Sequence, residues 1–349
     1  MSAERALRRA RFFLISALLG ANGACATAPG PPSSSKHWSV VRDDLDRVPL
    51  CAWGASPSDV WIGGGGLAAG GPVLLMRGDG AAFVEQPAPV QGTLWWLHGT
   101  GANDVWAVGE KGLALHWDGS AWSTRPTGTD ANLYGVWAAA ADDVWIVGGS
   151  PTSSGPTDVL IHYDGASFTL VPPPRALGAT YFKVWGLSST DVLVVASAGL
   201  ALHFDGTSWS EVATGSHATL FTVHGGSSPA GDFPGSSAVR AIGGSPPVLL
   251  RWKGDAFEAE STPPEMSGAM TGVFVDASGV TFITGERYQR YELDVAGKFQ
   301  NDTDHLMLFG DLHAVWGDGR GNAVAVGGNY VGLTDPTVVP KGLVIRYGD

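Results

Sequence analysis

Positively charged side chains are scarce in this sequence. Its 349 residues include 21 Lys and Arg against 33 Asp and Glu, which gives a formal charge of −12, and charged residues make up only 15% of the chain. A protein that binds nucleic acid needs a basic patch to neutralise phosphates. The composition therefore excludes a nucleic-acid partner, and the negative charge is expected to keep the protein soluble and monomeric.

A membrane-spanning run is not evident near the N-terminus. The apolar run from Phe12 to Ala21 has ten residues, whereas a transmembrane helix needs ~20. It follows the arginine-rich segment Met1–Arg11 and precedes the small residues 22–26. This basic, apolar and small-residue order is typical of a secretory signal, with an uncleaved membrane anchor as the alternative.

Cysteine is nearly absent, and one of the two positions follows the apolar run. The triplet Gly-Ala-Cys that ends at Cys25 resembles the lipobox of bacterial lipoproteins, in which the cysteine is lipidated and becomes the first mature residue. The resemblance implies a signal peptide over residues 1–25 and lipid attachment at Cys25. The family usually has Leu where this sequence has Asn22, so ordinary cleavage after Ala26 stays open.

The second cysteine, Cys51, is expected to be unpaired if Cys25 carries lipid, and to lie buried on a strand as a small hydrophobe. A Cys25–Cys51 disulfide requires a Cys25 that escapes lipidation. Residues 26–36 lack hydrophobic periodicity and are expected to form a flexible tether. Loss of a leader with four Arg and one Glu would leave a charge near −15, and lipid would be the only membrane contact.

Glycine and aromatic residues dominate the rest of the chain. The sequence has 50 Gly and 14 Trp, and residues 133–168 hold short runs of Val, Ile, Trp and Tyr that are bounded by Gly, Asp, Pro or Ser. Such runs are typical of β-strands joined by tight turns. The pattern recurs along the chain, so a repeat architecture is predicted.

Seven repeats can be aligned on one aromatic or imidazole residue in the first strand of each repeat. These marker residues are Trp53, His98, Trp137, Trp185, His224, Phe274 and Trp316, with spacings of 45, 39, 48, 39, 50 and 42 residues. A period of about 40–50 residues with four strands per repeat is typical of a propeller blade. In the fifth repeat an insertion at residues 227–237 delays the second strand to Ala238–Gly243.

The clearest repeat reads Trp-Gly-x-Ser-x-x-Asp-Val-Trp from Trp53 to Trp61. Its first strand is expected to end at the first Trp, and its second strand to begin at the Val. The third strand ends in Asp-Gly, as at Asp118-Gly119, which is a hairpin signal because Gly accepts positive φ. The fourth strand then begins with an aromatic residue such as Trp122.

The two ends of the chain supply complementary strands. The last repeat lacks a fourth strand, and Trp38 lies fifteen residues before Trp53, as Trp122 lies fifteen before Trp137. We therefore predict that residues 37–349 form an all-β, seven-bladed β-propeller of four-stranded antiparallel blades. The N-terminal strand is expected to close the last blade beside residues 343–347, which removes an exposed sheet edge.

These repeats resemble the broad family of seven-bladed propellers of the kelch and WD-repeat type, and in particular secreted bacterial propeller lipoproteins rich in Asp-Val-Trp-x-Val-Gly and Asp-Gly-x-x-Trp. The resemblance covers residues 37–349. It implies the fold and an exported location, as an outer-membrane or cell-surface lipoprotein or alternatively a secreted or periplasmic protein. Because propellers host many chemistries, it implies no single function.

One position near the end of the third strand is assigned a cation or an imidazole in every repeat. The residues are Arg77, His116, His162, His203, Arg251, Arg290 and Arg346. The histidines belong to different blades and are too far apart to share a metal, so no metal site and no cofactor are expected. An ion pair within each blade is expected instead, with the Asp that begins the second strand in four repeats: Asp59, Asp104, Asp143 and Asp191.

The markers His98 and His224 are expected to be core substitutions, with a ligand contact near the axis as the alternative.

No catalytic residue is predicted. A Gly-x-Ser-x-Gly elbow is absent from the sequence, and glycosidase chemistry needs two carboxylates in one cleft. The acidic clusters are expected in solvated loops between blades: Glu258, Glu260 and Glu265, and Asp302 and Asp304. A carbohydrate-active hydrolase or lyase that uses loop acids remains the alternative to a binding protein.

The loops between the second and third strands are long in the first, third and seventh repeats, and they share one face with the loops that join successive blades. Long loops on a rigid scaffold often carry binding residues. We therefore expect a non-enzymatic binding or scaffold protein that recognises an unknown protein or glycan partner through this face. Asn329, Tyr330 and Asp335 are the candidate contacts. A purely structural envelope protein is a third possibility.

Overall fold

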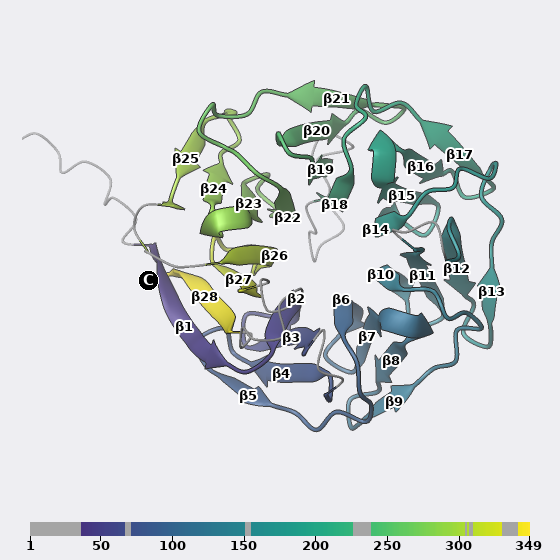
Figure 1. Ribbon diagram of the computed structural model, residues 1–349, viewed down its shortest axis with the longest axis horizontal. Coiled ribbons are helices and arrows are strands. Elements are labelled where there is room, and N and C mark those ends of the chain that lie inside the picture. The colour runs from purple at the N-terminus through teal and green to yellow at the C-terminus, as the bar shows by residue number, and fades with distance from the viewer. Residues whose placement is uncertain are drawn as a thin grey trace, which may run out of the picture. The chain divides into compact units, whose positions relative to one another are not determined.

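The computed structural model describes residues 36–349 except 67–70, 151–154, 226–238, 304–305, 307–309 and 330–340. The predicted signal peptide, Cys25 and nearly all of the tether lie outside these ranges. The described chain forms seven four-stranded antiparallel sheets, arranged as a ring of blades (Figure 1). The predicted all-β seven-bladed propeller is confirmed. Over the described ranges, the chain forms no helix with the length and apolar character that crossing a membrane requires.

Each blade runs from strand A beside the axis to strand D at the rim. Blade 1 consists of β2 (Val48–Ser56), β3 (Asp59–Gly65), β4 (Leu74–Gly78) and β5 (Phe83–Glu85), and blade 2 consists of β6 (Leu94–Gly101), β7 (Asp104–Gly109), β8 (Ala114–Trp117) and β9 (Trp122–Thr124). Blade 3 consists of β10 (Leu133–Ala140), β11 (Asp143–Gly148), β12 (Val159–Tyr163) and β13 (Phe168–Leu170), and blade 4 consists of β14 (Tyr181–Ser188), β15 (Asp191–Ala196), β16 (Ala201–Phe204) and β17 (Trp209–Val212). Blades 5 to 7 are β18 (Leu220–Gly225), β19 (Val239–Gly243), β20 (Val248–Trp252), β21 (Phe257–Glu260); β22 (Met270–Val275), β23 (Thr281–Gly285), β24 (Arg290–Leu293), β25 (Phe299–Asn301); and β26 (Asp311–Gly317), β27 (Ala323–Gly328), β28 (Gly342–Gly348), β1 (His37–Leu45). Three short 3-10 turns, η1 (Glu110–Gly112), η2 (Ser197–Gly199) and η4 (Glu286–Tyr288), join strands B and C of blades 2, 4 and 6.

Blade 7 is built from both ends of the propeller segment. Strand β1 pairs antiparallel with β28, and Trp38 lies opposite Tyr347. Their ring centroids are 5.4 Å apart, and Trp38 is buried. In Figure 1 the N-terminal strand β1 lies along the outer side of β28, where the chain ends. The predicted closure is therefore confirmed, because β1 supplies the missing strand D.

The marker alignment matches the register of strands A and B. Trp53 lies opposite Trp61 and Trp137 lies opposite Trp145. The strand ends differ from the prediction, because strand A continues past Trp53 to Ser56 and strand B begins at Asp59 rather than at the Val. Ser56 pairs with Asp59 across a local register shift, so both strands extend into the turn.

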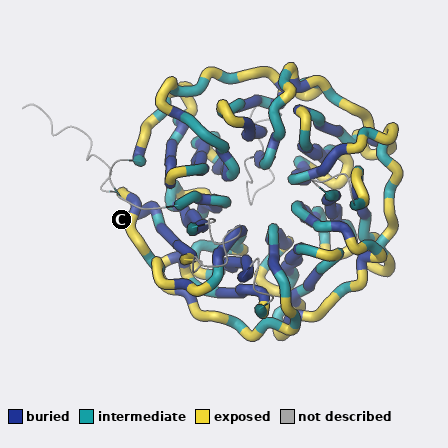
Figure 2. The backbone as a smooth tube through the Cα atoms, viewed as in Figure 1, coloured by how far each residue is buried: buried dark blue, intermediate teal, exposed yellow. Residues whose placement is uncertain are grey.

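The core is repeated between neighbouring blades. Trp61 of blade 1 packs against Trp117 and Trp122 of blade 2, with centroid distances of 5.1 Å to each. Trp145 of blade 3 contacts blade 4 in the same way through Phe204 and Trp209. The strand B Trp of one blade thus packs against the aromatic residue that begins strand D of the next blade. Figure 2 shows buried positions along the inner strands and exposed ones mainly along the rim.

Candidate functional site

A β-bulge interrupts strand A near its start in all seven blades. The register to strand B shifts between the residues four and two positions before each marker. The extra residue lies three positions before the marker, and a bulge can re-aim such a side chain. The seven bulged residues are Leu50, Trp95, Tyr134, Phe182, Phe221, Thr271 and His313. Six of them, all but Leu50, line one axial cavity of about 260 Å³.

Five of these side chains form a continuous aromatic arc, which we call the collar. Its members in ring order are His313, Trp95, Tyr134, Phe182 and Phe221, and successive ring centroids are 6.2, 5.5, 5.4 and 5.5 Å apart. Each of the five residues is only half-buried. Because strand A begins at the end where strand D of the preceding blade connects, the collar lies on the face of the B–C and D–A loops.

Among the described residues, Lys183 is the one amine that lines the collar cavity. It follows Phe182 on β14, so it lies one residue deeper along strand A, and it is 4% exposed. Its Nζ donates a hydrogen bond to the backbone carbonyl of Tyr134 at 3.2 Å and lies 3.1 Å from the ring centroid of Trp96. The side chain therefore reaches past blade 3, from blade 4 to blade 2. Within the described ranges it forms no ion pair with a carboxylate.

Burial controls the ionisation of the groups around this amine. Burial lowers the pKa of Lys183 well below its ordinary value. Burial and the nearby Lys183 lower the pKa of His313 to about 4, although its hydrogen bond to the carbonyl of Leu50 acts in the opposite direction. Burial raises the pKa of the Cys51 thiol to about 12. His313 and Cys51 are therefore neutral at pH 7. Cys51 is buried and free, as predicted for a small hydrophobe.

The marker residues line a second and wider axial cavity. Its volume is about 590 Å³, and all seven blades contribute their marker side chain. The markers lie toward the end of strand A, so this cavity belongs to the face of the A–B and C–D loops. Marker rings of neighbouring blades pack on one another in its wall. Trp185 and His224 lie 3.9 Å apart, and His224 and Phe274 lie 4.5 Å apart, measured between centroids.

The histidine markers His98 and His224 occupy core positions. Each is at most 9% exposed, and each accepts a backbone hydrogen bond from the next blade. Burial lowers the pKa of both imidazoles to about 3, so both are neutral at pH 7. Since Nδ1 is the acceptor, the proton of the neutral ring is on Nε2. These contacts are those of core residues, as predicted.

The intrablade pairs predicted for strands B and C are present in four blades. The Nε2 atoms of His116, His162 and His203 lie 2.6, 2.7 and 2.9 Å from carboxylate oxygens of Asp104, Asp143 and Asp191. Arg77 contacts both carboxylate oxygens of Asp59, at 2.5 and 2.9 Å. These residues join strands B and C away from the axis, and none of them lines either axial cavity.

The prediction of a cation near the end of strand C is wrong for blade 6. The residue opposite Phe282 is Glu292, not Arg290, so the position is not cationic in every blade. Arg290 lies opposite Thr284 and is fully buried. Its guanidinium donates to the backbone carbonyls of residues 288, 302 and 303. Arg290 therefore anchors the chain after β25 instead of pairing with a strand B carboxylate.

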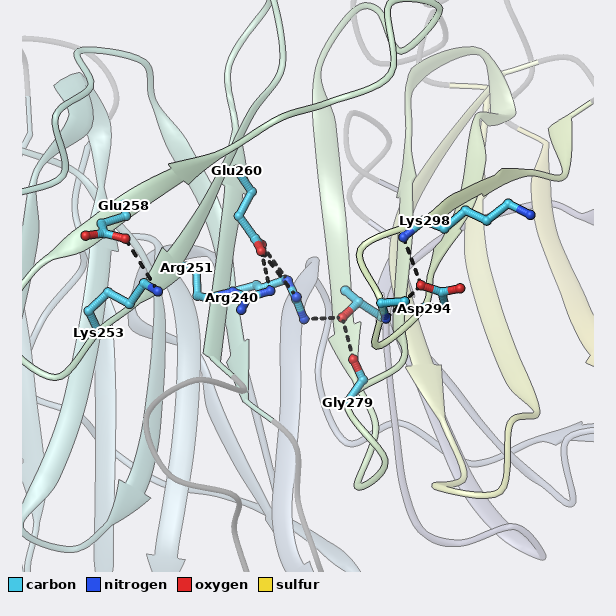
Figure 3. Close-up of polar contacts among 10 residues, drawn as sticks. Arg240, Arg251, Lys253, Glu258, Glu260, Gly279, Asp294 and Lys298 are labelled. Carbon is cyan, nitrogen blue, oxygen red and sulfur yellow. Dashed lines mark hydrogen bonds and ion pairs between the residues drawn. The ribbon is translucent and has the colours of Figure 1, made fainter.

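The acidic cluster around Glu260 also differs from the prediction. Glu258 and Glu260 lie on strand β21 rather than in a loop. Glu260 accepts from Arg240 at 2.6 Å and from Arg251 at 2.5 Å, and Glu258 pairs with Lys253 at 3.4 Å; Figure 3 shows these side chains facing one another. Asp302 is buried beside Gln300, and Asp304 lies outside the described residues. None of the described members of either cluster lines the two axial cavities.

The loop predicted to carry the contacts is described only at its base. The backbone N–H of Asn329 donates to the carbonyl of Lys341 at 2.9 Å, which closes the loop between β27 and β28. Tyr330 and Asp335 lie outside the described residues. This loop joins strands B and C, so its base lies on the same face as the collar. The collar itself was not identified from the sequence.

Comparisons with known proteins support the fold. No protein-family model and no curated protein matches the sequence. Among solved structures, the chain is similar to YCF48 from Cyanidioschyzon merolae (12% identity, TM-score 0.64, 89% of this chain and 98% of that one). It is also similar to YCF48 bound to D1 peptide (13%, 0.63, 89% and 97%) and to virginiamycin B lyase from Staphylococcus aureus (11%, 0.65, 88% and 99%). At these identities the likeness shows a shared propeller scaffold.

Proposed function

We propose that this chain is an exported, lipid-anchored propeller that binds a protein or glycan partner through the face of the B–C and D–A loops. The observation that carries the proposal is the collar. Bulges at one position in seven blades bring six bulged side chains to the axial cavity, and five of these six are half-buried rings. Aromatic side chains dominate binding energy at protein interfaces because they bury a large rigid surface.

The charge and chemistry of the site favour binding over turnover. Within the described ranges, neither axial cavity is lined by an Asp or Glu, so the acid pair that glycosidase chemistry needs is not assembled there. One propeller of similar fold is described with a bound peptide, and we include a peptide segment among the partners proposed for this chain.

Partner capture from a cell-envelope extract tests the proposed face. The variant Trp95→Ala/Phe182→Ala removes two collar rings and is expected to lower capture by tenfold or more. The matched control is Val84→Ala/Leu170→Ala, which removes two exposed apolar side chains from the outer strands β5 and β13. Circular dichroism should show that both variants fold. Equal capture by the collar variant and the control would reject the collar as the binding surface.

The loop between β27 and β28 is the second part of the proposed face, with Asn329, Tyr330 and Asp335 as its contacts. Deleting residues 331–340 is expected to abolish capture and leave the fold intact, because β27 ends at Gly328 and β28 begins at Gly342. Unchanged capture would remove this loop from the site.

Export and lipid attachment are supported by the sequence of residues 1–25. Mass spectrometry of the mature N-terminus tests them directly. We expect Cys25 to be the first residue and to carry lipid. A mature chain that begins after Ala26 without lipid would reject the anchor and leave a secreted or periplasmic protein.

A further inference from the structure

We propose that the collar cavity binds a small aromatic carboxylate, with the ring of the ligand among the collar side chains and its carboxylate on the amine of Lys183. This site goes beyond partner binding, because it takes a free small molecule.

The aromatic rings that line the cavity suit a flat apolar group of a ligand. Trp95, Tyr134, Phe182 and Phe221 follow one another around the axis with centroid spacings of 5.4–5.5 Å. Aromatic rings prefer offset or edge-to-face contacts at about 4.5–7 Å. A ligand ring placed among them would cover ring surfaces that are now partly exposed. The volume of about 260 Å³ is small, which limits the ligand to one or two rings.

Lys183 supplies one ionisable amine beneath that wall. Its Nζ has a carbonyl on one side and the face of Trp96 on another. An ammonium has three N–H donors, and the described contacts use one of them on a hydrogen-bond acceptor. Because Lys183 also lines the cavity, a ligand carboxylate can accept from the remaining donors. A buried ammonium is unfavourable without a partner anion, so an incoming carboxylate would supply the missing counter-charge.

The other titratable groups near Lys183 do not compete for this role. Cys51 and His313 are the groups whose electrostatic interaction with Lys183 is evident, and both are neutral at pH 7. Aromatic rings alone would also suit a cationic ligand. A bound cation would oppose the protonation of Lys183, whereas a bound carboxylate would favour it, so the site favours an anion. Thr271, which also lines the cavity, already donates its hydroxyl to the carbonyl of Leu312 at 2.8 Å.

Binding should be coupled to protonation. Burial favours the neutral amine of Lys183 in the empty site. A bound carboxylate favours the charged ammonium, so binding should take up a proton when the empty site is neutral. The apparent affinity for a carboxylate should then fall as the pH rises, whereas the affinity for an uncharged ring should stay constant.

Isothermal titration of the full chain with benzoate, benzyl alcohol and benzylamine tests the proposal. Benzoate is expected to bind at least tenfold more tightly than benzyl alcohol at pH 7, and benzylamine more weakly than both. Titration of benzoate in two buffers with different ionisation enthalpies should reveal proton uptake. Equal affinity for benzoate and benzyl alcohol in the unmodified chain would overturn the proposal, and this comparison requires no variant.

Variants then assign the interaction to residues. Lys183→Met should reduce the affinity for benzoate to that for benzyl alcohol, whereas Phe182→Ala should weaken both ligands. Lys253→Met is the matched control, because Lys253 lies on the surface and pairs with Glu258; it should leave both affinities unchanged. A folded Lys183→Met variant that still prefers benzoate would overturn the role of Lys183. Since no partner protein is present, these outcomes are independent of the capture experiment.

Discussion

The Nδ1 atom of His98 accepts a hydrogen bond from the backbone N–H of Ala138 in the next blade, at 3.0 Å. His224 makes the same contact with Val275, at 3.1 Å. The other five markers are Trp or Phe, and the facing residue of the next blade is always Gly. A Cβ added to any of these glycines would lie 2.3–2.9 Å from the ring of the preceding blade; they are Gly54, Gly99, Gly186, Gly225 and Gly317. A Trp or Phe marker thus occurs where the facing residue of the next blade is Gly, and a His marker occurs where that residue has a side chain.

This relationship predicts a compensating pair of substitutions. His98→Trp should lower the free energy of unfolding by about 1–3 kcal/mol, because the larger ring meets the Ala138 side chain. Adding Ala138→Gly should restore most of that loss by recreating the Trp–Gly contact of the other blades. Ala138→Gly alone is expected to cost about 0.5–1 kcal/mol. Urea unfolding of the four proteins measures the coupling. A double variant no more stable than His98→Trp would contradict the relationship.

Acid should destabilise the propeller through its two buried markers. Burial lowers the pKa of His98 and His224 to about 3, with Asp104 opposing the shift at His98 and His98 adding to it at His224. In the unfolded chain each histidine has a pKa near 6.5. The free energy of unfolding that each neutral ring contributes is therefore fully present above pH 6.5 and is lost as the pH falls toward 3. At pH 5 the loss is about 2 kcal/mol for each histidine.

The doubly substituted His98→Trp/Ala138→Gly protein provides the measurement. Between pH 7 and pH 5 its free energy of unfolding should fall by about 2 kcal/mol less than that of the unmodified chain, because one titrating imidazole is gone. His313, whose pKa burial and Lys183 lower to about 4, contributes equally to both proteins. The same pH dependence in both would show that His98 is not the titrating group.

The sequence predicted those features that depend on local periodicity. The marker residues, the Asp-Gly hairpins and the spacing of Trp38 before Trp53 each lie within one repeat, and strand register follows from them. The closure of blade 7 could be predicted because a missing strand at one end matched a surplus strand at the other.

The collar could not be predicted in the same way. Whether the residue three before a marker faces the axis depends on a bulge, and a bulge is set by the register with strand B, not by the residue itself. Phe182 and Lys183 therefore resemble ordinary alternating strand residues in the sequence. Arg290 shows the opposite error. Its positive charge fits the predicted pattern, but Glu292 holds the equivalent register position.

The pair of His116 and Asp104 should stabilise blade 2. Burial would raise the pKa of Asp104, but hydrogen bonds from His116 and Thr100 outweigh it and hold that pKa below its ordinary value. Asp104→Ala leaves the His116 ring without its acceptor beside Trp106, and should lower the free energy of unfolding by about 1–3 kcal/mol. Glu211→Ala, which breaks the exposed pair with Arg175, is the control and should change it by about 0–1 kcal/mol. Similar losses in both variants, measured by urea unfolding, would contradict the assigned role.

Trp38 should control the closure of the ring. Its ring packs on Tyr347 of blade 7 and lies 5.9 Å from the guanidinium carbon of Arg290 in blade 6, so it joins two blades. Trp38→Ala should lower the free energy of unfolding by about 3–5 kcal/mol. Val40 lies on the same strand but is 40% exposed, so Val40→Ala should change it by only about 0.5 kcal/mol. Release of β1 would also leave β28 as an open edge, so we expect Trp38→Ala to self-associate in size-exclusion chromatography. If Trp38→Ala matched Val40→Ala in both measurements, the contact between β1 and β28 would not be what holds the ring closed.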